Sequence, residues 1–288
     1  MAMWTTCVLF LASAAAFNPA AQLSLTVRYG SLMQSSLSPL PSSQRSHALV
    51  PSPGRRSPIA GAMMASSAGK TPEVGEVDTM RIASYFGATG AQVLIITCVM
   101  AVVQTVGAQL PPLWYKVVAC IFFAGMSLKS RVFAILDARR PELGSELGNK
   151  IMVETKRPSW TPPGVVFPIV WSTIGILRTV SSMLIWEACG RQMLTLPLLA
   201  MMTHLAIGDT WNNINNVEQR KGTAVAGVAF VWASVMSVIY IYWQTFPLAG
   251  MVLAPSGLWL SIASFLIYSI WKLNGSDPIL PLKSTTSA

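Results

Sequence analysis

Six long apolar stretches follow one another from about residue 91 onward, and they constrain the fold more than any other feature of the chain. Each comes close to the roughly 20 mostly apolar residues that a membrane-spanning helix needs. They cover about 91–109, 112–133, 164–187, 194–214, 223–245 and 249–271. Charged residues make up only 11% of the 288, too few to cover a soluble globule. The sequence therefore predicts an all-α integral membrane protein and argues against a soluble enzyme.

The formal net charge of +9 follows a pattern along the chain. Basic residues gather in the long connection at about 134–163, in the turn at about 217–222 and in the C-terminal tail, whereas the joints between them hold only Arg191. Basic residues favour the inner side of a membrane, so this alternation predicts that the three segments share that side. The excess charge is therefore an orientation signal, and we expect no nucleic-acid site.

Residues 1–72 have the composition of a two-part targeting sequence. A short apolar run at 8–16 ends in three alanines and is too short to span a bilayer, as in a signal peptide. Residues 17–72 are rich in Ser, Pro and Ala and hold no Asp or Glu, as in a transit peptide. The combination resembles the plastid presequence of algae with secondary plastids. We expect a signal peptide at 1–16, a transit-like presequence at 17–72, a linker at 73–90 and a plastid membrane location; the alternative is a disordered tail with an accidental apolar start.

A run rich in proline and tryptophan leads into the third apolar stretch. It reads RPSWTPPG at residues 157–164, with Phe167 and Trp171 following. The last stretch holds Leu258-Trp259 and ends in IWKLN at residues 270–274. This pattern resembles the tryptophan-rich sensory protein/translocator protein family, also called the TspO/peripheral benzodiazepine receptor family, over about residues 112–274.

The resemblance implies a five-helix membrane bundle at 112–274, preceded by one additional transmembrane helix at 91–111 and followed by a tail at 275–288. It implies a ligand cavity between the helices, closed by the loop before the family's second helix. The expected ligands are tetrapyrroles such as protoporphyrin IX or haem, sterols and other apolar molecules, and the expected assembly is a homodimer. The family's proposed activities include transport, regulation and light-dependent porphyrin breakdown. A factor that helps to assemble pigment–protein complexes without its own ligand is the alternative.

The candidate ligand-binding residues combine family-matching positions with polar groups peculiar to this chain. Aromatic rings stack on flat macrocycles, and ionisable groups at membrane depth usually face a cavity or a partner. The candidates are Trp160, Pro162, Pro163, Phe167, Trp171, Arg178, His204, Asp209, Trp211, Asn212, Trp259, Tyr268 and Trp271. For each tryptophan the alternative is a place in the interface belt or in helix packing. Tyr268 also belongs to a loose sterol-contact pattern, Leu266-x-Tyr268-x-x-x-Lys272.

Helix geometry relates three of these candidates. At about 1.5 Å per residue, Arg178 and His204 lie at similar depth on antiparallel helices, and Asp209 lies within reach of a long arginine. We therefore expect an Arg178–Asp209 ion pair or shared network at the cavity, with a purely structural staple as the alternative. Asp209, Asn212 and Asn216 share one helix face by their spacing. The sequence shows no metal-ligand cluster, phosphate-binding glycine loop or nucleophile triad, so we expect no catalytic or metal site.

Several positions depart from the family pattern where its members normally line the cavity. The departures are Val165, Ile174-Gly175, Gly208, Asn215-Asn216, Ser256 and Ile267. The scaffold is thus kept better than the pocket.

Overall fold

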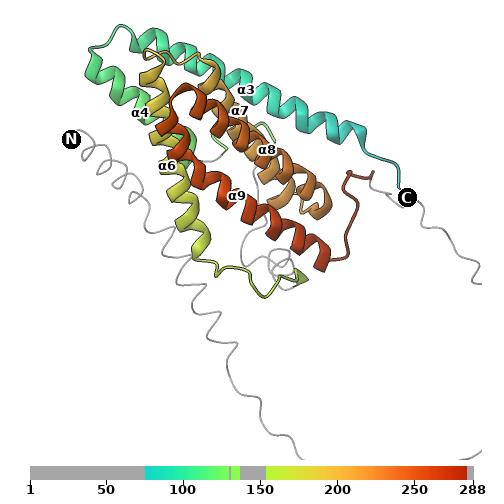
Figure 1. Cartoon of the computed structure of the whole chain (residues 1–288). Coiled ribbons are helices and arrows are strands. Elements are labelled where there is room, and N and C mark those ends of the chain that lie inside the picture. The colour runs from blue at the N-terminus through green and yellow to red at the C-terminus, as the bar shows by residue number, and fades with distance from the viewer. Residues whose placement is uncertain (1–74, 130, 137–153, 284–288) are drawn as a thin grey trace, which may run out of the picture. The chain divides into compact units, whose positions relative to one another are not determined.

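The apolar stretches fold into six helices in the computed structural model, which describes residues 75–129, 131–136 and 154–283 (Figure 1). The helices are α3 (Thr79–Gly107), α4 (Pro112–Leu128), α6 (Val166–Ala188), α7 (Leu196–Asn216), α8 (Lys221–Thr245) and α9 (Pro247–Leu273). Prolines lie in the first turn of α4, α7 and α9, where a helix does not need the missing N–H group. The predicted all-α membrane fold is confirmed.

Two predicted helix boundaries were wrong. Helix α3 begins at Thr79, so most of the expected linker at 73–90 is helical. Asp78 caps it by accepting the backbone N–H of Arg81 at 2.9 Å, and this cap sets a start that apolar composition alone does not reveal. Helix α4 ends at Leu128 rather than near residue 133, because the next residue, Lys129, already has an extended backbone with φ of −102° and ψ of 97°. The expected signal peptide and presequence lie outside the described residues.

Four of the described helices, α3, α6, α8 and α9, are long and apolar enough to cross a membrane. Helix α4 has 17 residues and spans about 25 Å, slightly less than the roughly 30 Å hydrocarbon core of a bilayer. Helix α7 has 21 residues and carries polar side chains such as His204 and Asn213, which are buried against neighbouring helices. The protein is therefore a multi-pass membrane protein whose most polar helix is shielded from lipid by the others.

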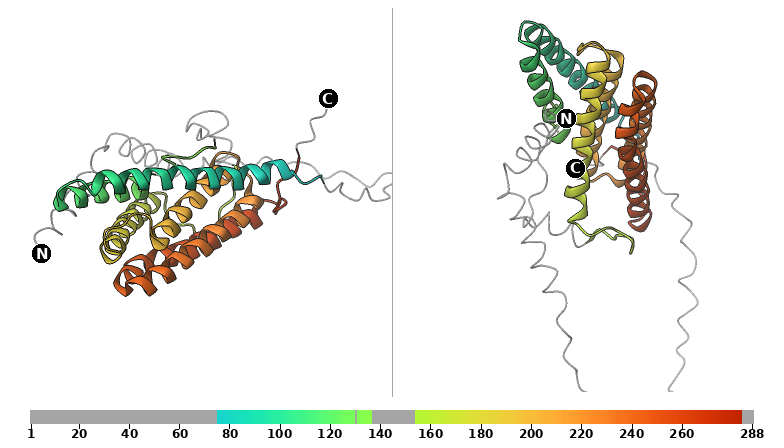
Figure 2. Two further views of the ribbon diagram at one scale, coloured as in Figure 1. Left: turned by 90° about the horizontal axis from the view of Figure 1, so that it is seen from above. Right: turned by 60° about the vertical axis from the view of Figure 1, so that its left-hand side comes forward.

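The described residues from Val77 onward belong to one compact unit, in which the helices form a ring. Neighbours follow in the order α3, α4, α6, α9, α8 and α7, and α7 packs against α3 again. Helices α3 and α9 accordingly lie on opposite sides of the ring (Figure 2). Sparser contacts join α6 to α7 and α8 and cross the ring interior. The additional helix α3 thus forms part of the wall, between α4 and α7.

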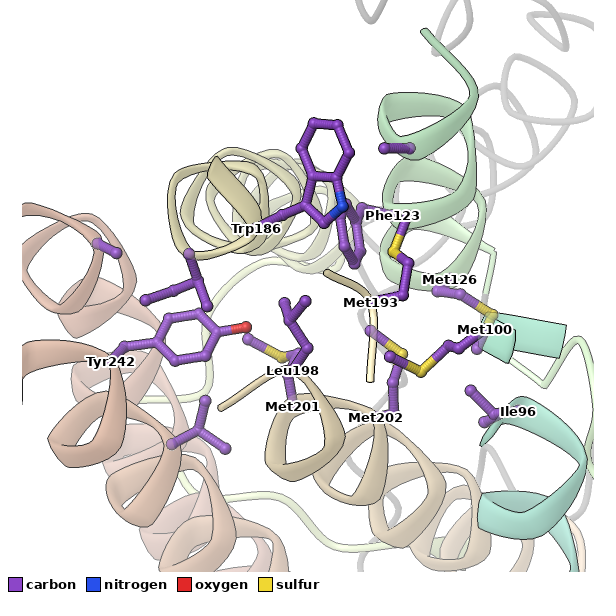
Figure 3. Close-up of a cluster of buried hydrophobic side chains, with 14 of the residues drawn as sticks. Ile96, Met100, Phe123, Met126, Trp186, Met193, Leu198, Met201, Met202 and Tyr242 are labelled. Carbon is purple, nitrogen blue, oxygen red and sulfur yellow. The ribbon is translucent and has the colours of Figure 1, made fainter. Parts of the chain in front are cut away.

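One end of the ring, which we call the packed end, holds the C-termini of α6 and α8 and is filled with buried apolar side chains (Figure 3). Trp186, Tyr242 and Phe123 are its largest members. Thioethers fill the space between them, from Met100, Met126, Met193, Met201 and Met202. Methionine suits such a place because its unbranched chain adapts to irregular gaps. The opposite end, which we call the loop end, holds the N-terminus of α6 and the C-terminus of α9.

Candidate functional site

A chain of three polar side chains crosses the ring interior from α6 through α7 to α8. Nη2 of Arg178 lies 2.9 Å from Nε2 of His204, and Nδ1 of His204 lies 2.8 Å from Oγ of Ser234. Ser234 in turn donates to the backbone carbonyl of Val231 at 2.8 Å. Arg178 and His204 are thus in contact, as their predicted similar depth on antiparallel helices implies.

These contacts assign the proton on the His204 ring and the hydrogen of the Ser234 hydroxyl. Arginine only donates, so Nε2 of His204 must accept and the imidazole is neutral with its proton on Nδ1. Since the Ser234 hydroxyl hydrogen goes to Val231, the Nδ1 proton of His204 goes to Oγ of Ser234. The hydrogen bonds therefore all run in one direction, from the guanidinium of Arg178 through His204 and Ser234 to the backbone carbonyl of Val231.

Arg178 keeps unused hydrogen-bonding capacity inside the ring. The residue is buried, and its Nε atom has no hydrogen-bond partner. Within the described part of the chain, no carboxylate lies within ion-pairing distance of it. A guanidinium has five N–H donors in a planar fork that matches a carboxylate, so an acceptor placed beside Arg178 would meet free donors.

The expected Arg178–Asp209 ion pair is not formed, and Asp209 belongs to a separate set of hydrogen bonds. Its carboxylate accepts Nε2 of Gln92 on α3 at 2.7 Å and the backbone N–H of Arg131 at 3.0 Å. The estimate from helix depth did not include α3, which supplies the nearer partner. Asp209 therefore links α3, α7 and the segment that follows α4.

Four of the candidate aromatic side chains lie in the half of the helix ring nearer the loop end, and all four are half-buried. Phe167 and Trp259 meet edge to face, with centroids 6.1 Å apart and an interplanar angle of 71°. Trp171 and Trp211 pack around a small core of Val231, Val235 and Leu260. The buried Nε1 of Trp259 has no hydrogen-bond partner, whereas Nε1 of Trp211 donates to the carbonyl of Ala224 at 3.1 Å.

Two of the aromatic residues lie on the same helix faces as the polar side chains of α6 and α7. Trp171 precedes Arg178 by seven residues on α6, and Trp211 follows His204 by seven on α7, so each pair shares a helix face. Because α6 and α7 run in opposite directions, both aromatic residues lie on the loop-end side of the polar residues. The packed end closes the other side with Ile185 and Trp186. The interior is therefore apolar and dense at one end, polar in the middle and aromatic toward the loop end.

Three other candidates lie away from this interior. Trp160 is 42% exposed and stacks on Phe265 of α9, with centroids 5.4 Å apart and an interplanar angle of 19°. Tyr268 and Trp271 also pair on α9, and the ammonium of Lys272 lies 4.8 Å from the Trp271 ring centroid. These rings form an aromatic and basic edge on α9, as in an interface belt.

The remaining candidates have local roles in the structure. Pro163 accepts the backbone N–H of Val166 in the turn that starts α6, and the neighbouring Pro162 is half-buried. Asn212 accepts a hydrogen bond from Asn216 one turn later, as their spacing on one helix face requires. A shallow groove of about 390 Å³ lies elsewhere, between α8 and α9. Its lining consists of Val225, Val228, Ala229, Trp232, Ser261 and Ser264, and includes none of the candidates.

The sequence profile of the TspO/MBR family matches residues 117–272, more than half of the chain. The chain belongs to the TspO/MBR family. Among curated relatives, Protein CrtK of Rhodobacter capsulatus is 30% identical over 126 residues, covering 43% of this chain and 79% of that protein. The Tryptophan-rich sensory protein of Cereibacter sphaeroides is 26% identical over 122 residues, covering 42% and 75%. The human Translocator protein is 26% identical over 144 residues, covering 46% and 85%. The predicted family is confirmed, and α3 precedes the matched region.

One departure from the TspO/MBR pattern has a structural explanation. A Cβ atom on Gly175 would lie 2.6 Å from Cδ2 of Leu128 and 3.1 Å from the carbonyl oxygen of Ser127. The end of α4 therefore fills the space beside α6, where a larger side chain would collide with it. In this member of the TspO/MBR family, α4 packs directly against α6 at Gly175.

Sequence reasoning missed three residues that hold these parts together. Ser234 ends the polar chain, Gln92 holds Asp209, and Asn274 binds the backbone of Lys156 through two hydrogen bonds of 2.8 and 3.0 Å. A polar side chain within an apolar run was the available indication for Gln92 and Ser234, since such groups require partners at membrane depth. Asn274 is the last residue of the IWKLN ending.

Proposed function

We propose that this chain is a plastid membrane protein that binds a tetrapyrrole, such as protoporphyrin IX or haem, or a related flat apolar ligand, and that it serves a regulatory or transport role. The observation that carries the proposal is the set of half-buried rings at the loop end of the interior: Phe167, Trp171, Trp211 and Trp259. Flat apolar ligands bind where aromatic faces and a few polar groups converge. The chemistry favoured here is binding rather than catalysis by the protein's own side chains.

Porphyrin titration of the purified full chain in detergent tests the proposal. We expect saturable binding in the micromolar range, followed through the porphyrin's Soret band so that removing a tryptophan does not alter the reporter. Trp171→Leu and Trp259→Leu should each weaken binding by roughly threefold to tenfold, as expected for the loss of one stacking partner. Trp114→Leu is the matched control, because Trp114 is 61% exposed on α4 and should not affect affinity.

A second candidate function is support of pigment–protein complex assembly without a ligand of its own. The observation in its favour is the close approach of Leu128 to Gly175, which reduces the space available beside α6. If the chain binds no porphyrin but co-purifies with pigment–protein complexes, this second function replaces the first. Equal affinity in the Trp114, Trp171 and Trp259 variants would also contradict the site proposed above.

The plastid location rests on the composition of residues 1–72. Import across several membranes removes both parts of such a presequence, so we expect the mature chain to begin near residue 73. N-terminal sequencing of the protein isolated from its native membrane is the measurement. A mature chain beginning at residue 1 or 2 would contradict the targeting assignment.

A further inference from the structure

Arg178 lies inside the helix ring with part of its hydrogen-bonding capacity unused. Its guanidinium is anchored at one nitrogen by His204, while Nε is buried without a partner. Asp209 interacts electrostatically with Arg178 but accepts no hydrogen bond from it, because its carboxylate is bound by Gln92 and by the backbone N–H of Arg131. A buried cation whose donors are incompletely used is costly at membrane depth, unless an acceptor completes the site.

We propose that Arg178 binds the carboxylate of the ligand, so that the site selects free-acid tetrapyrroles over their esters. This inference rests on the proposed function and specifies its ligand class. The register of the site supports it: Trp171 lies about 10 Å from Arg178 along the same face of α6, on the loop-end side. A ring stacked among the loop-end aromatic residues would therefore direct a short carboxylate arm toward the guanidinium.

His204 and Ser234 act as positioning residues in this arrangement. His204 accepts one donor of the guanidinium, from Nη2, and the neighbouring Nε–H, which has no partner, is left for the ligand. Ser234 accepts the Nδ1 proton, which fixes the tautomer that leaves Nε2 able to accept. Neutral His204 also avoids a second positive charge beside Arg178.

The experiment compares ligands that differ only in the group at issue. The full chain is titrated with protoporphyrin IX, with its dimethyl ester and with a long-chain fatty acid, which carries a carboxylate but no ring. We expect the free acid to bind at least about tenfold tighter than the ester, the usual scale for a hydrogen bond to a charged group. The fatty acid should not displace the porphyrin at comparable concentrations, since it lacks the ring that the aromatic residues hold.

Variants then assign the preference to the polar chain. Arg178→Gln should reduce the affinity for the acid to that for the ester and leave the ester unchanged, while Arg191→Gln, on an exposed loop residue, should change neither. His204→Leu should reduce the preference, and His204→Gln should restore part of it, because the amide oxygen can accept from Nη2. A role in folding alone would not change the ratio of the two affinities.

Each outcome decides between the proposals. If the wild-type chain binds neither porphyrin, the proposed function fails. If it binds acid and ester equally, the proposed function stands and the inference about Arg178 is wrong. If the fatty acid competes as well as the porphyrin, the site recognises carboxylates without a ring, and the inference is again wrong. Should Arg178→Gln fail to fold, the wild-type ratio of acid to ester still decides.

Discussion

At the scale of single residues, Asn274 makes the contact that is easiest to test. Its side chain accepts the backbone N–H of Lys156 at 3.0 Å and donates to the Lys156 carbonyl at 2.8 Å, which fixes the segment before α6 against the end of α9. Asn274→Ala removes both bonds, so local opening of this segment should become more frequent. We expect trypsin to cut the Lys156–Arg157 bond roughly threefold to tenfold faster, the effect of losing about 1 kcal/mol of net hydrogen bonding.

The internal control for this experiment is cleavage after Arg191, on the joint between α6 and α7, which should not change. Asn274→Asp keeps an acceptor for the Lys156 N–H but loses the donor, so its cleavage rate should fall between wild type and Asn274→Ala. An unchanged rate at Lys156 in Asn274→Ala would show that other contacts hold the segment, such as the stacking of Trp160 on Phe265.

The candidate site was predictable in part, for reasons visible at single residues. Arg178 and His204 could be paired because helix rise fixes depth and ionisable groups in membrane helices need partners. Asp209 was misassigned because its nearer partner, Gln92, comes from a helix whose position in the ring a linear sequence does not give. Trp160 was expected at the cavity, yet its ring faces Phe265, since rotation about the loop backbone is not encoded in a spacing pattern.

At the scale of elements, apolar composition located the helices but not all their ends. Continuous apolar runs are sufficient where proline and short joints bound them, as at the start of α9. Helix α3 extends to Thr79 through a stretch with Gly87, Gly90 and several polar residues, and capping by Asp78 sets its start. The polar residues of this stretch have partners in the structure: Arg81 and Tyr85 both bind Glu218, just after the end of α7.

At the scale of the whole molecule, α3 closes a ring that the family-matched region alone would leave open between α4 and α7. It does so through polar contacts along its length. Arg81 and Tyr85 bind Glu218, Thr89 binds Thr210, Gln92 binds Asp209, and Gln104 accepts from the backbone of Met193 and Leu194. Without α3, these groups of α7 and of the residues that flank it would face lipid, where unsatisfied polar groups are costly. The additional helix is therefore part of what makes the polar interior of this family member stable.

Loss of one of these contacts should consequently lower the stability of the whole ring. Gln92→Leu keeps an apolar side chain of similar size but leaves Asp209 without its side-chain donor. We expect the free energy of unfolding to fall by about 1–3 kcal/mol, the usual penalty for a buried acceptor that loses its partner. Denaturation in mixed detergent micelles measures it, and Leu94→Ala is the control: Leu94 is 65% exposed on the same helix, so its truncation should cost less than about 0.5 kcal/mol. Replacing Thr89 and Thr210 together by valine should also be nearly neutral, because both partners of that hydrogen bond are then removed at constant shape. If Gln92→Leu is as stable as Leu94→Ala, α3 is an attachment to a self-sufficient bundle rather than part of its wall.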